Sequence, residues 1–282
     1  MVGTMMPLAL VVVGALQTTT DTTFAVRGTP RIEMRDVRGS VYVESWDQPQ
    51  VRIRATHGSR DRVQVDDRGG VVTIRAVRDQ GRPVAVDYRI TVPRAVALTL
   101  TGTTADFHVT GVRGDIRVES VEGDLVFRDL GSVTATTVEG DITLDGAAGN
   151  VRVSSTDGDL IVRRVRGDLI ANTIDGEVTL EGIEASNVDV NTVDGDIRYD
   201  GVIRDRGQYR FATHDGDITL LVPSTINAMV SVATFDGDFE STFPVQVRPG
   251  GHRGHRIGFT IGNGSAQLEI ESFDGAIRLL SR

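Results

Sequence analysis

Apolar and polar residues alternate along most of this chain, and short polar turns interrupt the alternation at regular intervals. In Val178-Thr179-Leu180 every second residue is apolar, and Val188-Asp189-Val190 repeats the pattern after an intervening turn. A period of two places successive side chains on opposite faces of an extended strand, so each segment is predicted to be a strand with one buried face. The alternation therefore predicts an all-β protein.

The turns carry a repeated motif, Ser/Thr–x–acid–Gly–acid–apolar, in which only the last copy lacks the second acid. Its copies begin at Ser120, Thr137, Ser155, Thr173, Thr192, Thr213, Thr234 and Ser272. The starts are 17, 18, 18, 19, 21, 21 and 38 residues apart. We interpret the last interval as two coils of 19, the second of which has lost its motif around Arg253–Arg256.

A second turn, such as Gly149-Asn150-Val151, divides each repeat into two short strands. One such unit cannot bury its apolar face alone, whereas stacking like strand on like strand gives two parallel sheets over one core. The predicted fold is a β-solenoid, β-helix-like, with two-strand coils of about 18–21 residues. The motif Ser/Thr is expected to face inward and bond turn backbone, and the motif glycine to adopt a left-handed conformation.

Residues 26–110 alternate like strands but lack the motif. The segment Asp67-Arg68-Gly69-Gly70 is typical of a hairpin turn that leads into Val71–Val77. We expect residues 26–110 to form an irregular, partly antiparallel section that caps the open end of the core. Residues 111–282 would then be the repeat solenoid with its C-terminal cap. No flexible linker separates the two sections, which favours one continuous domain.

The apolar run Met5–Leu16 has the length of the hydrophobic region of a signal peptide, and a polar stretch, Thr18–Thr23, follows it. Residues 1–25 are therefore predicted to contain a signal peptide, with the mature chain starting between Ala15 and Ala25. An uncleaved anchor, which would be the only membrane contact, and a buried strand are the alternatives. Export to the periplasm, cell envelope or extracellular space is the expected location.

Composition removes several classes of function. The chain has no cysteine, which excludes disulfides, thiolate metal sites and cysteine nucleophiles. A net charge of −9 argues against nucleic acid as a partner, because binding a polyanion rests on neutralising phosphates. No phosphate-binding loop, nucleophile elbow or dinucleotide fingerprint is present. No catalytic residue and no cofactor are predicted.

Stacking in register would place the motif acids in two columns. The first is Glu122, Glu139, Asp157, Asp175, Asp194, Asp215 and Asp236, and the second is Asp124, Asp141, Asp159, Glu177, Asp196, Asp217 and Asp238. Two carboxylates about 6 Å apart repel by about 3 kcal/mol at an effective dielectric near 20. The acids therefore need solvent, hydrogen bonds from turn amides, or bridging cations.

Two interpretations of these acids stay open, structural turn residues or a ladder of calcium ions. The ladder would use Asp157, Asp159, Asp175, Glu177, Asp194, Asp196, Asp215, Asp217, Asp236 and Asp238. The GGxGxD repeat of calcium-binding β-rolls is absent. Every motif acid has the spacing of a glycosidase pair from its neighbour, so spacing does not single out a catalytic pair.

The residue after each motif Ser/Thr forms a further column. Its members are Val121, Val138, Thr156, Ile174, Val193, His214, Phe235 and Phe273. If the Ser/Thr points inward, this column points outward and forms an apolar stripe, which usually marks a contact surface. A reversal of parity at the corner would bury these residues instead, and the sequence does not distinguish the two arrangements.

The motif pattern resembles a widespread bacterial domain family of unknown function labelled "putative adhesin", whose members are β-solenoids. The match spans Arg31–Leu280 and includes the Gly-acid-apolar turns, the Val-Pro step in Tyr88–Arg94, the strand Ile218–Pro223 and the turn Gly262–Ser265. The acid-Gly-acid turn departs from the family, which more often has a small residue before glycine. The resemblance implies an exported protein with no known catalysis.

The favoured function is a non-catalytic, exported cell-envelope or surface protein, an adhesin or scaffold whose ligand is a protein or a glycan. The alternative is a carbohydrate-active β-helix enzyme, a polysaccharide lyase or glycosidase. Such an enzyme would need one coil that departs from the repeat and gathers acids and aromatic residues in a groove. The sequence shows no coil of that kind.

Overall fold

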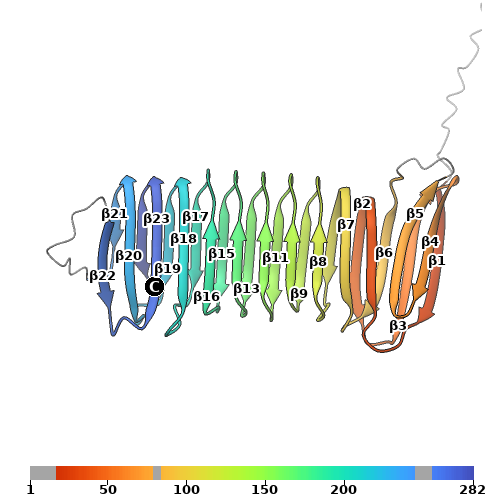
Figure 1. Cartoon of the computed structure of the whole chain (residues 1–282), viewed down its shortest axis with the longest axis horizontal. Coiled ribbons are helices and arrows are strands. Elements are labelled where there is room, and N and C mark those ends of the chain that lie inside the picture. Colours follow the sequence, from red (N-terminus) through yellow and green to blue (C-terminus); the bar gives the residue numbers. More distant parts are fainter. Residues whose placement is uncertain (1–16, 79–83, 245–255) are drawn as a thin grey trace, which may run out of the picture.

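The computed structural model describes residues 17–78, 84–244 and 256–282. Every regular element in these ranges is a strand, and the strands stack along one long axis (Figure 1). They belong to one continuous hydrogen-bonded sheet of 24 strands. The predicted all-β solenoid is confirmed, whereas the apolar run Met5–Leu16 lies outside the described residues.

The regular coils contribute one strand to each of two sides. One side contains β8 (Ile116–Glu119), β10 (Val133–Thr136), β12 (Val151–Ser154), β14 (Leu169–Asn172), β16 (Asn187–Asn191) and β18 (Gln208–Asp215). The other contains β9 (Leu125–Leu130), β11 (Ile142–Ala147), β13 (Leu160–Val165), β15 (Val178–Ile183), β17 (Ile197–Gly201) and β19 (Ile218–Val222). Neighbours on each side pair in parallel and in register, as the repeat predicts.

Two long strands carry the coil arrangement into the N-terminal section. Strand β7 (Ala97–Thr110) pairs with β8 through its first half and with β9 through its second half. Strand β2 (Arg31–Trp46) runs parallel to β7 along almost its whole length. Parallel stacking therefore begins before residue 111, because one unbroken strand here replaces the two strands of a repeat.

The remaining N-terminal strands close the end of the stack. Strands β5 (Val71–Arg78) and β6 (Asp87–Pro93) lie parallel to the two halves of β2. Strands β4 (Asp61–Arg68), β3 (Gln50–Gly58) and β1 (Gln17–Ala25) then add in antiparallel fashion. The predicted β4–β5 hairpin is confirmed. Cleavage of a signal peptide would leave β1 intact only if it occurred before Gln17.

The C-terminal coils do not stack in the order of the sequence. Here the strands are β20 (Ala228–Asp236), β21 (Phe239–Ser241), β22 (Arg256–Ile261), β23 (Ala266–Asp274) and β24 (Ile277–Ser281). Strand β23 lies between β18 and β20, and β24 lies between β19 and β21. The last coil of the chain, β23 and β24, is thus inserted between the coil of β18 and β19 and the coil of β20 and β21. We call it the inserted coil.

The expectation of an intervening coil around Arg253–Arg256 is therefore wrong. Strand β22 pairs antiparallel with β20, so it caps the stack and does not form a parallel coil. The preceding residues, 245–255, lie outside the described ranges. The long motif interval therefore contains the capping strand β22 in place of a parallel coil.

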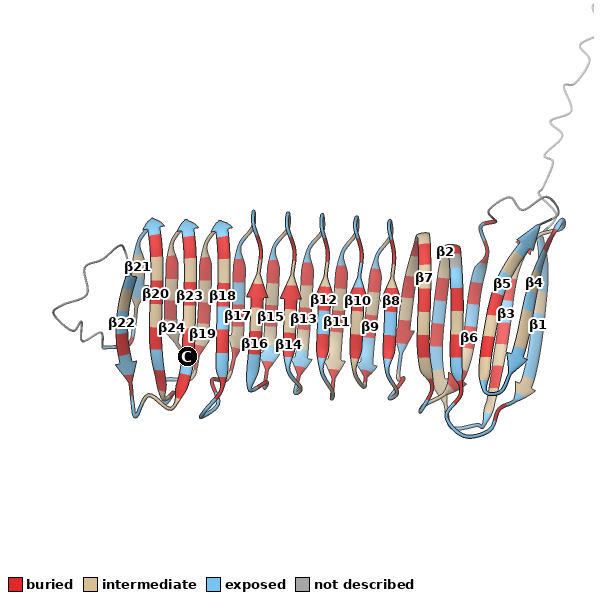
Figure 2. Cartoon of the chain, in the orientation of Figure 1, coloured by how far each residue is buried: buried red, intermediate tan, exposed pale blue. Residues whose placement is uncertain are grey.

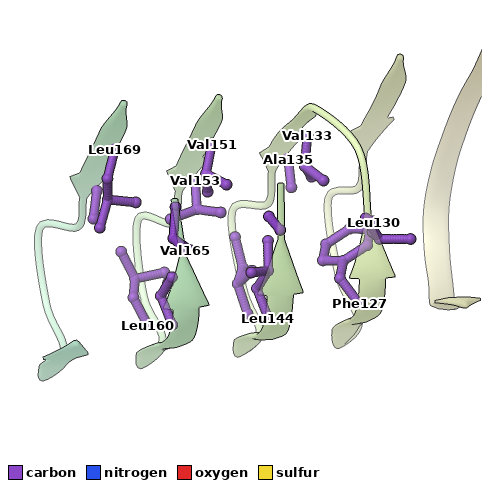
Figure 3. Packing of buried hydrophobic residues seen from close by; sticks show 14 of the residues in the cluster. Phe127, Leu130, Val133, Ala135, Leu144, Val151, Val153, Leu160, Val165 and Leu169 are labelled. Atoms are coloured by element: carbon purple, nitrogen blue, oxygen red, sulfur yellow. The ribbon is translucent and has the colours of Figure 1, made fainter. Parts of the chain in front are cut away.

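One apolar core runs through the whole stack, and buried and exposed positions alternate along almost every strand (Figure 2). In the regular coils, side chains from the two sides meet in layers, as Leu144 and Leu160 do with Val151 and Val153 (Figure 3). Each coil adds the same apolar positions to the layer below it. A coil is therefore stabilised mainly by its two neighbours.

The motif glycine has a positive φ in seven of its eight copies, so the left-handed conformation expected for it is confirmed there. At Gly176 φ is 151°, in a region that glycine alone populates freely. A Cβ atom there would lie 2.3 Å from the carbonyl oxygen of Gly158 in the adjacent coil. Close approach between coils, in addition to the local turn, therefore requires glycine.

Candidate functional surface

The motif Ser/Thr residues are buried at the corner between the two sides, as predicted. Thr173 is 5% exposed, and its hydroxyl lies 3.2 Å from the carbonyl oxygen of Gly158 and 3.4 Å from that of Asp175. Ser155 makes the equivalent bond to Gly140 in the coil below. Such hydroxyls satisfy turn carbonyls and tie neighbouring coils together, whereas the buried hydroxyl of Thr234 has no hydrogen-bond partner among the described residues.

The second acid of the motif also connects the coils. Its Oδ1 accepts a hydrogen bond from the backbone N–H of the second acid of the next coil, at 2.8–3.1 Å. These bonds join Asp106 to Asp124, Asp124 to Asp141, Asp141 to Asp159, Asp159 to Glu177, Asp196 to Asp217, and Asp217 to Ala276. Five of the seven second acids thus receive an amide donor, which favours their charged form within the stack of acids.

Asp217 has an additional partner. The guanidinium of Arg278 lies 2.8 Å from its carboxylate, and this hydrogen bond, helped by the Ala276 amide, lowers the pKa of Asp217. The motif of the inserted coil carries Ala276 where the others carry an acid. The inserted coil therefore places a cation, and no second motif acid, beside Asp217.

The hydrogen bonds between the second acids and the backbone amides of the next coil lead to a prediction about stability. Asp159→Ala removes the acceptor for the Glu177 amide and should lower the free energy of unfolding by about 1–2 kcal/mol. Asp159→Asn removes the same charge but retains an oxygen acceptor, so it should cost clearly less. Chemical denaturation of both variants measures the difference. Equal losses would mean that the hydrogen bond contributes nothing.

The first acids of the motif are exposed and stack in register. Glu122, Glu139, Asp157, Asp175, Asp194 and Asp215 form a continuous series of parallel bridges. Asp274 of the inserted coil then lies between Asp215 and Asp236, which corrects the order expected from the sequence. We call this series the acid row.

Among the described residues, no three Asp, Glu or His side chains converge closely enough to hold a metal ion. The ten acids of the proposed calcium ladder lie in the two expected columns, and several of the second-column acids already accept amide hydrogen bonds. The ladder stays a prediction. A rise in melting temperature with calcium, beyond that given by sodium chloride of equal ionic strength, would support it, and equal melting temperatures would refute it.

The residue that follows each motif Ser/Thr points outward, so the corner does not reverse the alternation of inward and outward side chains. Its apolar members are 43–61% exposed and follow the acid row along the same corner of the solenoid. We call this column the ridge, made by Val121, Val138, Thr156, Ile174, Val193, His214, Phe273 and Phe235 in spatial order. The ridge contains six of the nine large apolar side chains that are exposed in the described residues.

Rings occupy the C-terminal end of the ridge. Because the last coil is inserted, Phe273 lies between His214 and Phe235, at ring-centroid distances of 4.7 and 4.8 Å, with the rings nearly parallel. Sequence order would have placed Phe235 next to His214 instead. The insertion therefore creates a three-ring stack at the end of a ridge whose other members are aliphatic apart from Thr156.

A second surface feature lies near the N-terminal end, and sequence reasoning missed it. Tyr42, Arg52, Arg54 and Arg89 line a hollow on the outer face of β2, β3 and β6. The parity of Val41 and Val43 already predicts that Tyr42 points outward. Only the pairing of β3 with β6, however, brings the arginines beside it.

Stacked parallel coils closed at both ends by antiparallel strands define a β-solenoid, and in the described residues no helix is long and apolar enough to cross a membrane. The chain belongs to the Toastrack DUF4097 family, whose profile matches residues 30–280. The expected family resemblance is thereby confirmed. No curated protein matches the chain.

Three solved structures are similar to the chain in fold. A putative lipid binding protein from Parabacteroides distasonis shares 10% identity over 93% of this chain and 96% of its own, with a TM-score of 0.50. A putative adhesin from Bacteroides fragilis shares 13% identity over 93% and 96%, with a TM-score of 0.45. A putative adhesin from P. distasonis shares 11% over 93% and 97%, with a TM-score of 0.38. At these identities the likeness concerns the fold alone.

Proposed function

We propose that this protein is a non-catalytic binding protein of the cell envelope or cell surface, which holds a protein partner along its ridge. The observation that carries the proposal is the ridge itself. Val138, Ile174 and Val193 expose 43, 52 and 47% of their surface in successive or nearby coils. Soluble proteins rarely leave several exposed apolar side chains in one row uncovered unless the row is a contact surface.

The spacing of the ridge favours a helical partner. Adjacent coils lie about 4.8 Å apart, close to the pitch of about 5.4 Å by which an α-helix presents one side chain per turn. An extended strand would present every second side chain at about 6.8 Å, which fits the coil spacing less well. One apolar residue per helical turn can therefore meet one ridge residue per coil over several turns.

The acid row defines the charge of the partner. Glu139, Asp157 and Asp175 run beside the ridge, one acid per coil, on a chain with a net charge of −9. A helix with Lys or Arg beside its apolar stripe would complement both features, since opposite potentials guide association and register. The proposed partner is thus a cationic amphipathic helix.

The environment of the repeated acids supports a binding role over catalysis. Five of the seven second acids accept a backbone amide of the adjacent coil, and the first acids are exposed to solvent. The hollow near the N-terminal end is lined by a single carboxylate, that of Glu44, whereas hydrolysis of glycosidic bonds uses two. These features favour the binding protein over the polysaccharide lyase or glycosidase.

Export remains part of the proposal and has a direct test. The apolar run Met5–Leu16 motivates it, and the place of β1 in the fold favours cleavage before Gln17. N-terminal sequencing of native protein from cell fractions measures both. An intact Met1 in the cytosolic fraction would contradict export.

The ridge proposal predicts binding of a synthetic helix with a leucine stripe flanked by lysines. Ile174→Ser combined with Val193→Ser should weaken this binding at least ten-fold, because both side chains are lost from the middle of the ridge. Added salt should also weaken it, since the acid row contributes through exposed charges. Isothermal titration calorimetry measures the affinities.

Two controls make this test specific. Val126→Ser combined with Ile170→Ser removes the same residue types from outward positions on β9 and β14, away from the ridge. This pair should leave the affinity unchanged. A helix in which glutamate replaces lysine should not bind. The proposal fails if the ridge pair and the control pair bind the lysine helix equally.

A further inference from the structure

The hollow near the N-terminal end arises from the register of five adjacent strands. Cross-strand pairing places Asp21, Arg54, Arg89, Tyr42 and His108 in one row on the outer face. The strands that carry this row lie side by side in the order β1, β3, β6, β2 and β7. Residues far apart in the sequence therefore meet on one flat surface.

A short side chain makes the surface concave. In the next row, Thr91 lies between Arg52 on β3 and Glu44 on β2. Thr91 and Ile90 form the floor, whereas the longer side chains of the arginines, Tyr42 and Glu44 surround it. The resulting hollow has a volume of about 370 Å³, within the range of small-ligand sites.

The hollow carries a cation, Arg89, for which the described residues supply no ionic partner. Asp21 binds Arg52 at 2.8 Å and Arg54 at 3.1 Å, and the hydrogen bond from Arg52, assisted by Arg54, lowers the pKa of Asp21 to about 2. Arg89 lies directly opposite Arg54 and forms no ion pair within the described residues. Like charges opposite one another destabilise a sheet, so this arrangement favours an anionic ligand.

An aromatic surface borders the same cation. The rings of Tyr42 and His108 stack at 4.6 Å and within 5° of parallel, and the guanidinium carbon of Arg89 lies 5.8 Å from the Tyr42 ring centroid. Tyr42 remains 41% exposed. His108 and the Arg89 guanidinium flank the Tyr42 ring on its two sides and fix its orientation, so the part that stays accessible beside the charge is the ring edge.

We propose that this hollow binds an acidic glycan, with the carboxylate of a uronate residue on Arg89 and its sugar ring against the exposed edge of Tyr42. The planar guanidinium forms paired hydrogen bonds with a carboxylate. Glu44, at the far wall, accepts hydrogen bonds from sugar hydroxyls, whereas its charge opposes a multivalent phosphate. This site lies on the outer face of the coils and does not depend on the ridge at the corner.

The test is titration of the full protein with a short oligogalacturonate. We expect saturable binding that Arg89→Gln weakens at least ten-fold. The fully methyl-esterified oligomer, which has the same rings without the charge, should also bind the wild type at least ten-fold more weakly. Tyr42→Leu should weaken both oligomers and leave the ratio between them unchanged, since it removes the ring and retains Arg89.

Arg152→Gln is the matched control, because Arg152 is an exposed outward arginine on β12, which belongs to the other side of the solenoid. It should bind as the wild type does, and thermal melts should show that all variants remain folded. Absence of saturable binding would overturn the proposal. So would equal affinities of the Arg89 and Arg152 variants, or displacement of the oligomer by an equal concentration of inorganic phosphate.

Discussion

Gly176→Val is expected to lower the free energy of unfolding by about 2–6 kcal/mol, the combined cost of a strained backbone and an overpacked contact. Its φ of 151° suits glycine alone, and a Cβ atom would lie 2.3 Å from the carbonyl oxygen of Gly158. The same carbonyl accepts the hydroxyl of Thr173, so displacing it also weakens that bond. Chemical denaturation and thermal melts measure the loss.

Gly258→Val is the matched control. Gly258 lies in the outermost strand β22, its φ is not in the positive range that favours glycine, and the nearest atom to an added Cβ would be 3.9 Å away. The free energy of unfolding of the Gly258→Val variant should differ from that of the wild type by no more than about 0.5 kcal/mol. Similar losses at the two positions would show that the contact between coils at Gly176 is not the cause.

Truncation after Ser265 is expected to produce an aggregating protein. Residues 266–282 form the inserted coil, whose Leu268, Ile270, Ile277 and Leu279 are at most 1% exposed. Each contributes about 1.5–3 kcal/mol of burial. Their loss also leaves the β18 and β19 edges uncovered and β20 without its parallel partner, and uncovered edges promote association. Size-exclusion chromatography and melts measure the result.

A longer internal deletion should be less harmful. Replacing residues 223–265 with a loop copied from 202–207, which joins β17 to β18, removes only the outermost strands β20, β21 and β22. The inserted coil keeps its partners β18 and β19 and becomes the last coil of the stack. We expect a folded protein, although its end lacks a cap. If the truncated and internally deleted proteins behave alike, the inserted order of the coils is wrong.

The sequence by itself determined the repeated part of the fold. The motif at Thr173 and its equivalents fixes the coil length, and alternation within strands such as Val178–Ile183 fixes which side chains are buried. Both follow from local rules, the two-residue period of a strand and the turn chemistry of Gly and Asp. Stacking then follows because neighbouring coils carry the same pattern. The inward Ser/Thr and the in-register acids were predictable for the same reason.

Tertiary structure alone decided the features that depend on pairing between distant segments. The motif at Ser272 does not reveal that its coil lies beneath the one containing Thr234, because both coils have the same pattern and fit either order. The corner parity that exposes Ile174 depends on the path of the turn in three dimensions. The meeting of Tyr42 and Arg89 depends on β6 lying beside β2, and strand pairing of this kind is not encoded in either strand alone.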